Sequence, residues 1–470
     1  MTKNRNINQS YLFFISITAA MGGFLFGYDT AVISGTISFV KSGFNLNTAM
    51  EGWFVSSALV GCIIGVSFAG EMSDRFGRKS SLILSGFLFL ISAVGCAVSA
   101  SHTELIIYRL IGGMGVGIAS MLSPLYISEV SPANIRGRMV AIYQFAITIG
   151  IVCAYFTNAS LLNYSEGPTY FNTDGIFYKM FVTEVWRAMF GSEIMPAFLF
   201  LFLMFFVPSS PRWLMAKNKN KTAEKILARI NSPEKVKLEL ESIKTAILNE
   251  RNGSWKSLFS KGTNVVLFAG IGLGVLSQFT GINAIIYYGP RIMEEAGIKL
   301  SDAFGGQVII GLVNMLATIY AIMKIDKYGR KNLMLGGISG MFVSLIVVGF
   351  LFLVGKTSGI LLLVFILTFI TSFAIGIGPV IWVLLSEIYP TKIRGRAMSI
   401  ATLALWTGTA IIGQLVPWML ENLSPAGTFF VFALFCIPVP FILKSIPETK
   451  GLSLEAIEEQ LREKSLIPNP

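Results

Sequence analysis

The chain has 470 residues, of which 53% are hydrophobic and only 13% are charged. Soluble domains carry about a quarter charged residues, so this composition excludes an ordinary soluble protein. The formal net charge is +11, but most lysines and arginines gather in alternate loops between apolar runs. This alternation follows the positive-inside rule. It predicts that both termini lie in the cytoplasm, and it argues against a nucleic-acid-binding face.

Twelve apolar runs are long enough to span a membrane, whose hydrocarbon core of about 30 Å requires a helix of about 20 residues. In chain order they cover residues 11–39, 50–70, 80–100, 104–127, 139–161, 188–207, 264–289, 302–324, 332–355, 359–385, 397–420 and 427–446. We therefore predict an all-α polytopic membrane protein with twelve transmembrane helices. The first run is too long for a signal-peptide core and is followed by no small-residue cleavage pattern, so we expect no cleavable signal.

The composition changes between the sixth and seventh runs. The segments TAEKILARI and LELESIKTAIL are charged and carry apolar residues at helical spacing, which is typical of short amphipathic helices. We expect these helices to join two halves beneath the membrane. The predicted organisation is a six-helix bundle over residues 1–210, a cytoplasmic linker over 211–262, a second six-helix bundle over 263–446 and a cytoplasmic tail over 447–470.

Two loop motifs occur once in each half. DRFGRK (74–79) follows the second run and DKYGRK (326–331) follows the eighth; SEVSPANIRGR (128–138) follows the fourth and SEIYPTKIRGR (386–396) follows the tenth. Many secondary transporters consist of repeated halves, with the substrate site at their interface near the middle of the membrane. The duplication therefore indicates a transporter.

The charged side chains of these loops are candidates for ion pairs at the cytoplasmic surface. A network of such pairs can hold the two halves in one arrangement and break in another; alternatively, the charges only anchor helix ends and set the topology. The candidate gating residues are Asp74, Arg78, Glu129, Arg136, Arg138, Arg212, Asp326, Arg330, Glu387 and Arg394.

The sequence offers little for catalysis or metal binding. The four cysteines lie inside apolar runs without a CxxC pair, and His102 is the single histidine. There is no Gly-x-x-x-x-Gly-Lys-[Ser/Thr] loop for ATP. We expect no enzyme activity, no metal and no cofactor, and the short C-terminal tail argues against a transporter-like sensor.

Several motifs together resemble the sugar porter family of the major facilitator superfamily over residues 11–451. They are GEMSDRFGRKS (70–80), the two RGR loops, PSSPRWL (208–214), QFTGINAIIYYGP (278–290), GPVIWVLLSEIYP (378–390) and PETKG (447–451). Within the family the chain is similar to bacterial D-xylose–proton symporters. The resemblance implies a monomer in the bacterial inner membrane that rocks between outward-open and inward-open states. It would import a monosaccharide, D-xylose or a related pentose or hexose, together with protons.

The resemblance also implies a sugar site in the central cavity. Amides supply the donors and acceptors that sugar hydroxyls need, and aromatic rings suit the C–H faces of the sugar; the same amides could instead hold helices together. The implied sugar-binding residues are Gln144, Gln278, Asn283, Asn314 and Trp382, with Phe26, Tyr287 and Trp406 as aromatic lining. Gln278 and Asn283 share a helix face only if the helix is distorted. Gly281, which lies between them, would permit such a distortion.

Four positions depart from the pattern that the chain resembles. Ser277 stands where the family has a glutamine, and Ile151 and Leu405 stand where the xylose porters have one. Because hydrogen-bonding groups discriminate strongly between hydroxyl patterns, the sugar stays open. Ser209 replaces the acid of the family's PESPR motif, which weakens one cytoplasmic ion pair.

Asp29 lies well inside the first apolar run, where a carboxylate is costly unless it is paired or protonated. Arg109 lies inside the fourth run. The resemblance pairs these two residues and makes Asp29 the proton-coupling site, with Glu193 in the sixth run as a helper or an interhelical partner. A static salt bridge in a passive sugar uniporter is the main alternative, and a polyol- or inositol–proton symporter is another.

Overall fold

The computed structural model of the protein describes residues 8–132, 135–167, 175–230, 232–250, 258, 263–355, 359–390, 393–450, 457 and 459–461. Within this part, twelve helical segments are long and apolar enough to cross a membrane. The predicted all-α fold with twelve spans is confirmed, and most of the span ends agree with the prediction to within about five residues. Lys41 and Arg291, which follow the first and the seventh apolar run in the sequence, both lie within helices, Lys41 in a last turn.

The first six spans come from seven helices. They are α1 (Gln9–Gly43), α2 (Thr48–Phe76), α3 (Arg78–Val98), α4 (His102–Val130), α5 (Arg136–Glu166) and a sixth span made of α7 (Val185–Gly191) and α8 (Ile194–Met204). Two short elements, α6 (Ile176–Tyr178) and the π-helix η1 (Lys179–Thr183), precede α7.

The last six spans come from nine helices. They are α12 (Thr263–Phe279) with α13 (Ile282–Glu295), α14 (Leu300–Tyr328), α15 (Arg330–Val354), α16 (Gly359–Gly376) with α17 (Gly378–Glu387), α18 (Arg394–Asn422), and α19 (Ser424–Cys436) with α20 (Pro438–Ser445). Two of the interruptions coincide with proline in the first turn of the new helix, at Pro379 and Pro438. Proline has no N–H to give to the preceding turn, so a helix restarts readily there.

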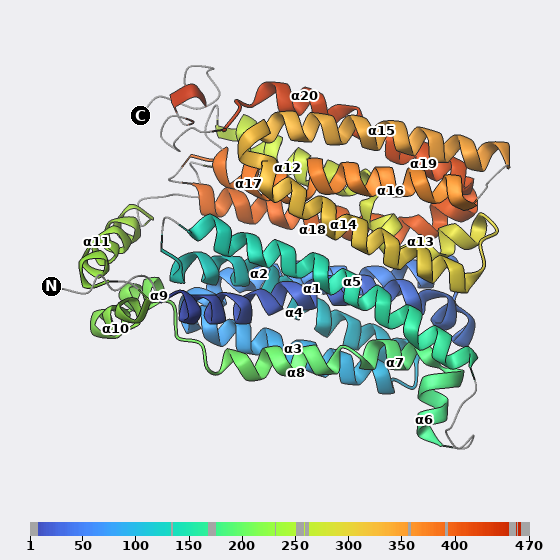
Figure 1. The fold of residues 1–470 in the computed structure, drawn as a ribbon, viewed down its shortest axis with the longest axis horizontal. Coiled ribbons are helices and arrows are strands. Elements are labelled where there is room, and N and C mark those ends of the chain that lie inside the picture. Colours follow the sequence, from blue (N-terminus) through green and yellow to red (C-terminus); the bar gives the residue numbers. More distant parts are fainter. Residues whose placement is uncertain are drawn as a thin grey trace.

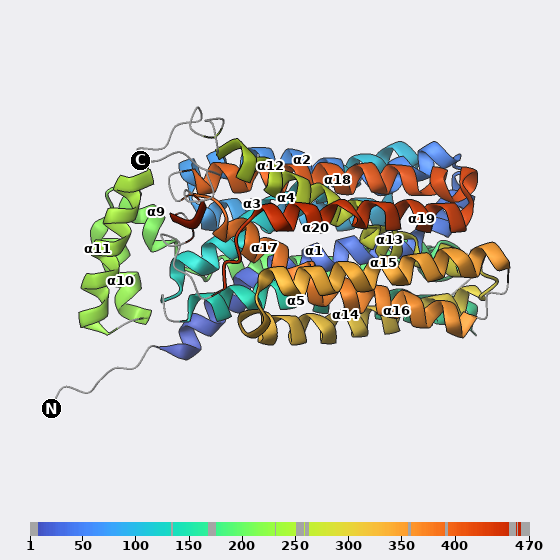
Figure 2. The same cartoon turned by 90° about the horizontal axis from the view of Figure 1, so that it is seen from above.

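The helices form two layers, α1–α8 in one and α12–α20 in the other (Figure 1). The main contacts between the layers are made by α2 with α18, by α5 with α14 and by α1 with α13. The linker helices α9 (Pro211–Ala216), α10 (Asn220–Ile230) and α11 (Pro233–Glu250) lie beyond one end of both layers (Figures 1 and 2). We call this the linker end and the opposite end, where α1 ends and α2 begins, the far end.

The linker helices have a small apolar core of their own. Leu214, Ala223 and Ile226 are buried together, with Trp213 against them. The Trp213 indole donates to the carbonyl of Asp74, 3.1 Å away, which attaches α9 to the last turn of α2. The boundaries proposed for the two bundles, the linker and the tail remain predictions.

Candidate functional site

Asp29 and Arg109 form a buried ion pair in the middle of the first layer. Arg109 Nη1 of α4 lies 2.5 Å from Asp29 Oδ1 of α1, and the two side chains are 3% and 7% exposed. The guanidinium also lies over the ring of Phe190 in α7, at 5.6 Å from its centroid. A charge-assisted hydrogen bond of this length is strong, so each charge compensates the burial of the other.

Glu193 lies close to this pair. It is 2% exposed at the junction of α7 and α8, near enough to Asp29 and Arg109 for their charges to act on its carboxyl group. Its neighbour Ser192 hydrogen-bonds the hydroxyl of Tyr28 at 2.7 Å. The two residues thus connect the broken sixth span to α1, directly beside Asp29.

A narrow cavity connects the ion pair to the second layer. Its lining includes Asp29 and Arg109 from the first layer and Tyr287 and Trp406 from the second, and its volume is about 10 Å³, the space of roughly one water molecule. Phe26 of α1 lies against Trp406 of α18, with ring centroids 5.3 Å apart. Two of the predicted aromatic residues, Tyr287 and Trp406, therefore share a cavity with the predicted proton site, and Phe26 packs against one of them.

Gln278 and Asn283 also meet, because the seventh span is broken between them. Gly281 has φ +87°, a conformation that glycine adopts readily, and a Cβ there would lie 2.4 Å from the Phe432 ring. The break brings Asn283 Nδ2 to 2.6 Å from Gln278 Oε1. The distortion expected at Gly281 is confirmed.

Two hydroxyl groups complete this amide pair. Ser277 Oγ accepts from Gln278 Nε2 at 3.0 Å, so the residue that departs from the family pattern still contacts the neighbouring glutamine. The Thr409 hydroxyl of α18 has its single proton shared between two acceptors, Gln278 Oε1 at 3.1 Å and the Leu405 carbonyl at 2.9 Å. Thr409 escaped the sequence analysis; only its position one turn after Leu405 could have suggested it.

The remaining predicted sugar residues lie on other helices. Asn314 of α14 is 9% exposed, whereas Gln144 of α5 and Trp382 of α17 are half-buried. The described hydrogen bonds do not connect these three side chains to the Gln278 pair. Ile151 and Leu405 are each 6% exposed, so apolar groups are buried at the two positions where the resemblance implied amides.

At the linker end, most of the predicted gating residues form two equivalent clusters. In the first half, Arg78 lies 3.1 Å from Asp74 and 3.0 Å from Glu129. In the second half, Arg330 lies 2.9 Å from Asp326 and 3.0 Å from Glu387. Each described cluster therefore joins helices within one half.

The other predicted gating arginines lie at the starts of helices. Arg136 and Arg394 donate to the equivalent carbonyls of Ser131 and Tyr389, at 3.4 and 3.3 Å. Arg138 is exposed at the start of α5, and Arg212 is half-buried in the first turn of α9. Sequence reasoning did not anticipate the role of Ser210, whose hydroxyl donates to Glu129.

A fold of two repeated six-span halves, with polar residues meeting at their boundary, is that of a secondary transporter. A family model described as "Sugar (and other) transporter" matches residues 15–461. The chain belongs to this family, and it is therefore a transporter and not an enzyme.

Individual relatives are similar over almost their whole length. The arabinose-proton symporter of Bacillus subtilis (strain 168) is 40% identical over 456 residues, which cover 97% of this chain and 96% of that protein. The D-xylose-proton symporter of Escherichia coli (strain K12) is 38% identical over 489 residues, with 97% and 96% covered. The proton:xylose symporter XylE bound to 6-bromo-6-deoxy-D-glucose has a similar structure, with a TM-score of 0.82 and 37% identity over 97% of this chain and 100% of that one.

Proposed function

We propose that the protein imports a monosaccharide together with protons by alternating access. The observation that carries this proposal is the shared cavity, where the Asp29–Arg109 pair and the sugar-type residues Tyr287 and Trp406 line the same space. A carboxylate that can exchange protons thus lies beside the place where a sugar would bind. The curated relatives named as arabinose– and D-xylose–proton symporters support the same assignment.

The coupling follows from the electrostatics of Asp29. Arg109 lies 2.5 Å from the Asp29 carboxyl group and supplies a counter-charge to it. When the two halves rock and the pair separates, a buried carboxylate without a counter-charge favours its neutral, protonated form. Proton uptake and release by Asp29 would therefore alternate with the change of access, and each proton would carry about 2.3 kcal/mol per 100 mV of membrane potential.

The sugar specificity would come from few polar groups. Gln278 Oε1 already accepts a hydrogen bond from Asn283, and it shares the Thr409 proton with the Leu405 carbonyl, so both of its lone pairs have a partner. Gln278 would then offer a sugar only an N–H, whereas Asn283 keeps one N–H and its carbonyl oxygen. With Ile151 and Leu405 apolar, we propose a pentose or hexose bound by fewer amides than in the xylose porters.

We further propose that the linker end faces the cytoplasm of a bacterium and that the far end faces outward. The basic loop motifs and α9–α11 lie at the linker end, as the positive-inside rule requires. In this orientation both termini would lie in the cytoplasm, and the protein would be an inner-membrane protein.

Transport by purified protein in liposomes tests the proposal. A panel of pentoses and hexoses is offered with and without an imposed pH gradient, while the internal pH is recorded. We expect one sugar to accumulate only with the gradient, and protons to enter only when that sugar is present. Equal entry with and without the gradient, without proton movement, would identify a passive uniporter and refute symport.

A further inference from the structure

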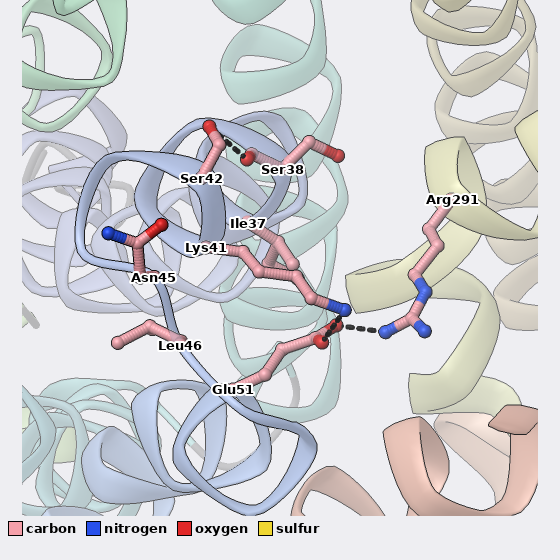
Figure 3. A pocket seen from close by; sticks show the side chains of 8 residues that line it. All are labelled: Ile37, Ser38, Lys41, Ser42, Asn45, Leu46, Glu51 and Arg291. Carbon is pink, nitrogen blue, oxygen red and sulfur yellow. Dashed lines mark hydrogen bonds and ion pairs between the residues drawn. The ribbon is translucent and has the colours of Figure 1, made fainter.

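At the far end, Glu51 links three helices by two ion pairs. Glu51, near the start of α2, is 0% exposed. Lys41 Nζ at the end of α1 lies 2.8 Å from its Oε2, and Arg291 of α13 binds its Oε1 (Figure 3). Lys41 belongs to the same layer as Glu51, but Arg291 belongs to the other. The Glu51–Arg291 pair therefore connects the two halves.

The helix held by Glu51 also carries predicted sugar residues. Asn283, Tyr287 and Arg291 follow one another at intervals of four in α13, so they lie along one face of the helix. On this face of α13, Tyr287 lines the cavity beside Asp29, and Arg291, one turn further toward the far end, binds Glu51. Any movement of α13 that releases Arg291 must also move Asn283 and Tyr287.

Proline makes α13 dependent on contacts outside the helix. Pro290 has no N–H for the carbonyl of Ile286 one turn earlier. That carbonyl instead accepts from the Tyr155 hydroxyl of α5 at 3.1 Å and from Gln307 Nε2 of α14 at 3.2 Å. The position of α13 is therefore set by its neighbours in both layers, and the hydrogen bond of Tyr155, like the ion pair of Glu51, crosses between them.

An open cavity at the far end borders this pair. A cavity of about 510 Å³ is lined by Lys41, Glu51 and Arg291 together with residues of the α1–α2 turn (Figure 3). The side chains of Lys41 and Arg291 are 39% and 17% exposed, whereas that of Glu51 is 1% exposed. The carboxylate thus lies at the inner wall of the cavity, between it and the interior of the protein.

We propose that Glu51 is a positioning residue for transport. Through Arg291 it holds the face of α13 that carries Asn283 and Tyr287 against the first half, and so it closes the far end. The Glu51–Arg291 pair must break each time that end opens. The proposal deepens the proposed function, since it identifies the contact that sets the outward access of the sugar site. Removing either partner breaks the link between the halves, because the remaining charge then has a partner only in its own half: Lys41 for Glu51, and Glu295, at 4.0 Å, for Arg291. Loss of the pair should therefore favour the open far end.

The native thiol of Cys62 reports this opening. Cys62 lines the cavity beside Asp29 and is 2% exposed, and it lies about three helical turns after Glu51 on α2. In a chain with Cys96, Cys153 and Cys436 replaced by serine, a membrane-impermeant maleimide is added to intact cells and, separately, to inside-out vesicles. We expect Glu51→Gln and Arg291→Gln each to raise the labelling rate in cells about tenfold or more and to lower it in inside-out vesicles.

Lys41→Gln is the matched control. It removes the other ion pair of Glu51 but leaves the link between the halves, so labelling should stay within about twofold of the parent chain. Glu51→Arg combined with Arg291→Glu, in the Lys41→Gln background, should restore slow labelling in cells and shows that the variants fold. The KM for the transported sugar should change more than the maximal rate of exchange.

The labelling needs neither a sugar nor a pH gradient, so it stands even if proton symport fails. Labelling of Glu51→Gln and Arg291→Gln at the parent rate would overturn the proposal. So would equal acceleration by Lys41→Gln, since the effect would then not arise from the link between the halves. Failure of the charge exchange to restore slow labelling would also count against it.

Discussion

Arg78 and Arg330 occupy equivalent places in the two halves, 252 residues apart in the chain. Each guanidinium binds the aspartate four residues before it, Asp74 or Asp326. Each also binds the glutamate of the second loop motif of its half, Glu129 or Glu387. The repeat extends to the next residue, because Lys79 and Lys331 both donate to a carbonyl at the end of their half, at 2.8 and 2.9 Å. The duplicated sequence motifs therefore form duplicated structures.

The two halves differ at the starts of α3 and α15. Glu448 accepts from the backbone N–H groups of Arg330 and Lys331, at 3.1 and 3.0 Å. A carboxylate at a helix N-terminus is favourable because it meets free N–H groups and the positive end of the helix dipole. In the first half Ser209 takes the place of this glutamate, and the described hydrogen bonds include no side chain that accepts from the N–H groups of Arg78 and Lys79.

We predict that Ser209→Glu stabilises the protein by about 0.3–1 kcal/mol. The new carboxylate would cap α3 as Glu448 caps α15. Thermal unfolding in detergent measures the change, and Ser209→Gln, which has the same shape without the charge, should give a smaller gain. A lower unfolding temperature for Ser209→Glu than for the parent would show that the two helix starts are not equivalent.

Gly281→Ala should impair both folding and sugar binding. The alanine Cβ would enter the Phe432 ring, and its φ of +87° would cost about 1–3 kcal/mol. Gly297→Ala is the control, because Gly297 has φ +80° but nothing within 4 Å of the added carbon. Thermal unfolding and sugar-binding calorimetry should show a clearly larger loss at Gly281; equal losses would mean that packing at the break is unimportant.

Thr409→Val should weaken sugar binding without unfolding the protein. The change keeps the shape of the side chain but removes the donor to Gln278 Oε1, which costs about 0.5–1.5 kcal/mol and frees that oxygen. We expect the KM to rise by about two- to tenfold and the preference among deoxy- and fluoro-sugars to change. Thr407→Val, at an exposed position on the same helix, should change neither the KM nor the sugar preference. If both variants changed the KM and neither changed the sugar preference, Thr409 would have no role in specificity.

The sequence predicted the spans well because twelve long apolar runs leave few alternatives in a membrane. It also predicted a break at Gly281, since two amides five residues apart share a face only when the helix bends. It could not show that Asn283 donates to Gln278 or that Thr409 joins them, because these contacts depend on packing between α12, α13 and α18. The ion pair of Glu51 could not be predicted for the same reason, because its partner Arg291 is 240 residues away.

The loop motifs were predicted more completely than the cavity. Arg78 and Arg330 lie four residues after their aspartates, so spacing alone indicates those pairs. No spacing relates Asp29 to Arg109, and their pairing was expected only from family resemblance. Whether Asp29 carries the proton remains a prediction.

Accumulation of sugar by liposomes with an imposed pH gradient, compared between the parent protein and Asp29→Asn, tests that prediction most directly. The asparagine keeps the size of the side chain but cannot bind and release a proton. We predict that the parent concentrates the sugar and acidifies the interior, whereas Asp29→Asn exchanges sugar at equal concentrations but does not concentrate it. Accumulation by Asp29→Asn to the level of the parent would contradict proton coupling through this carboxylate.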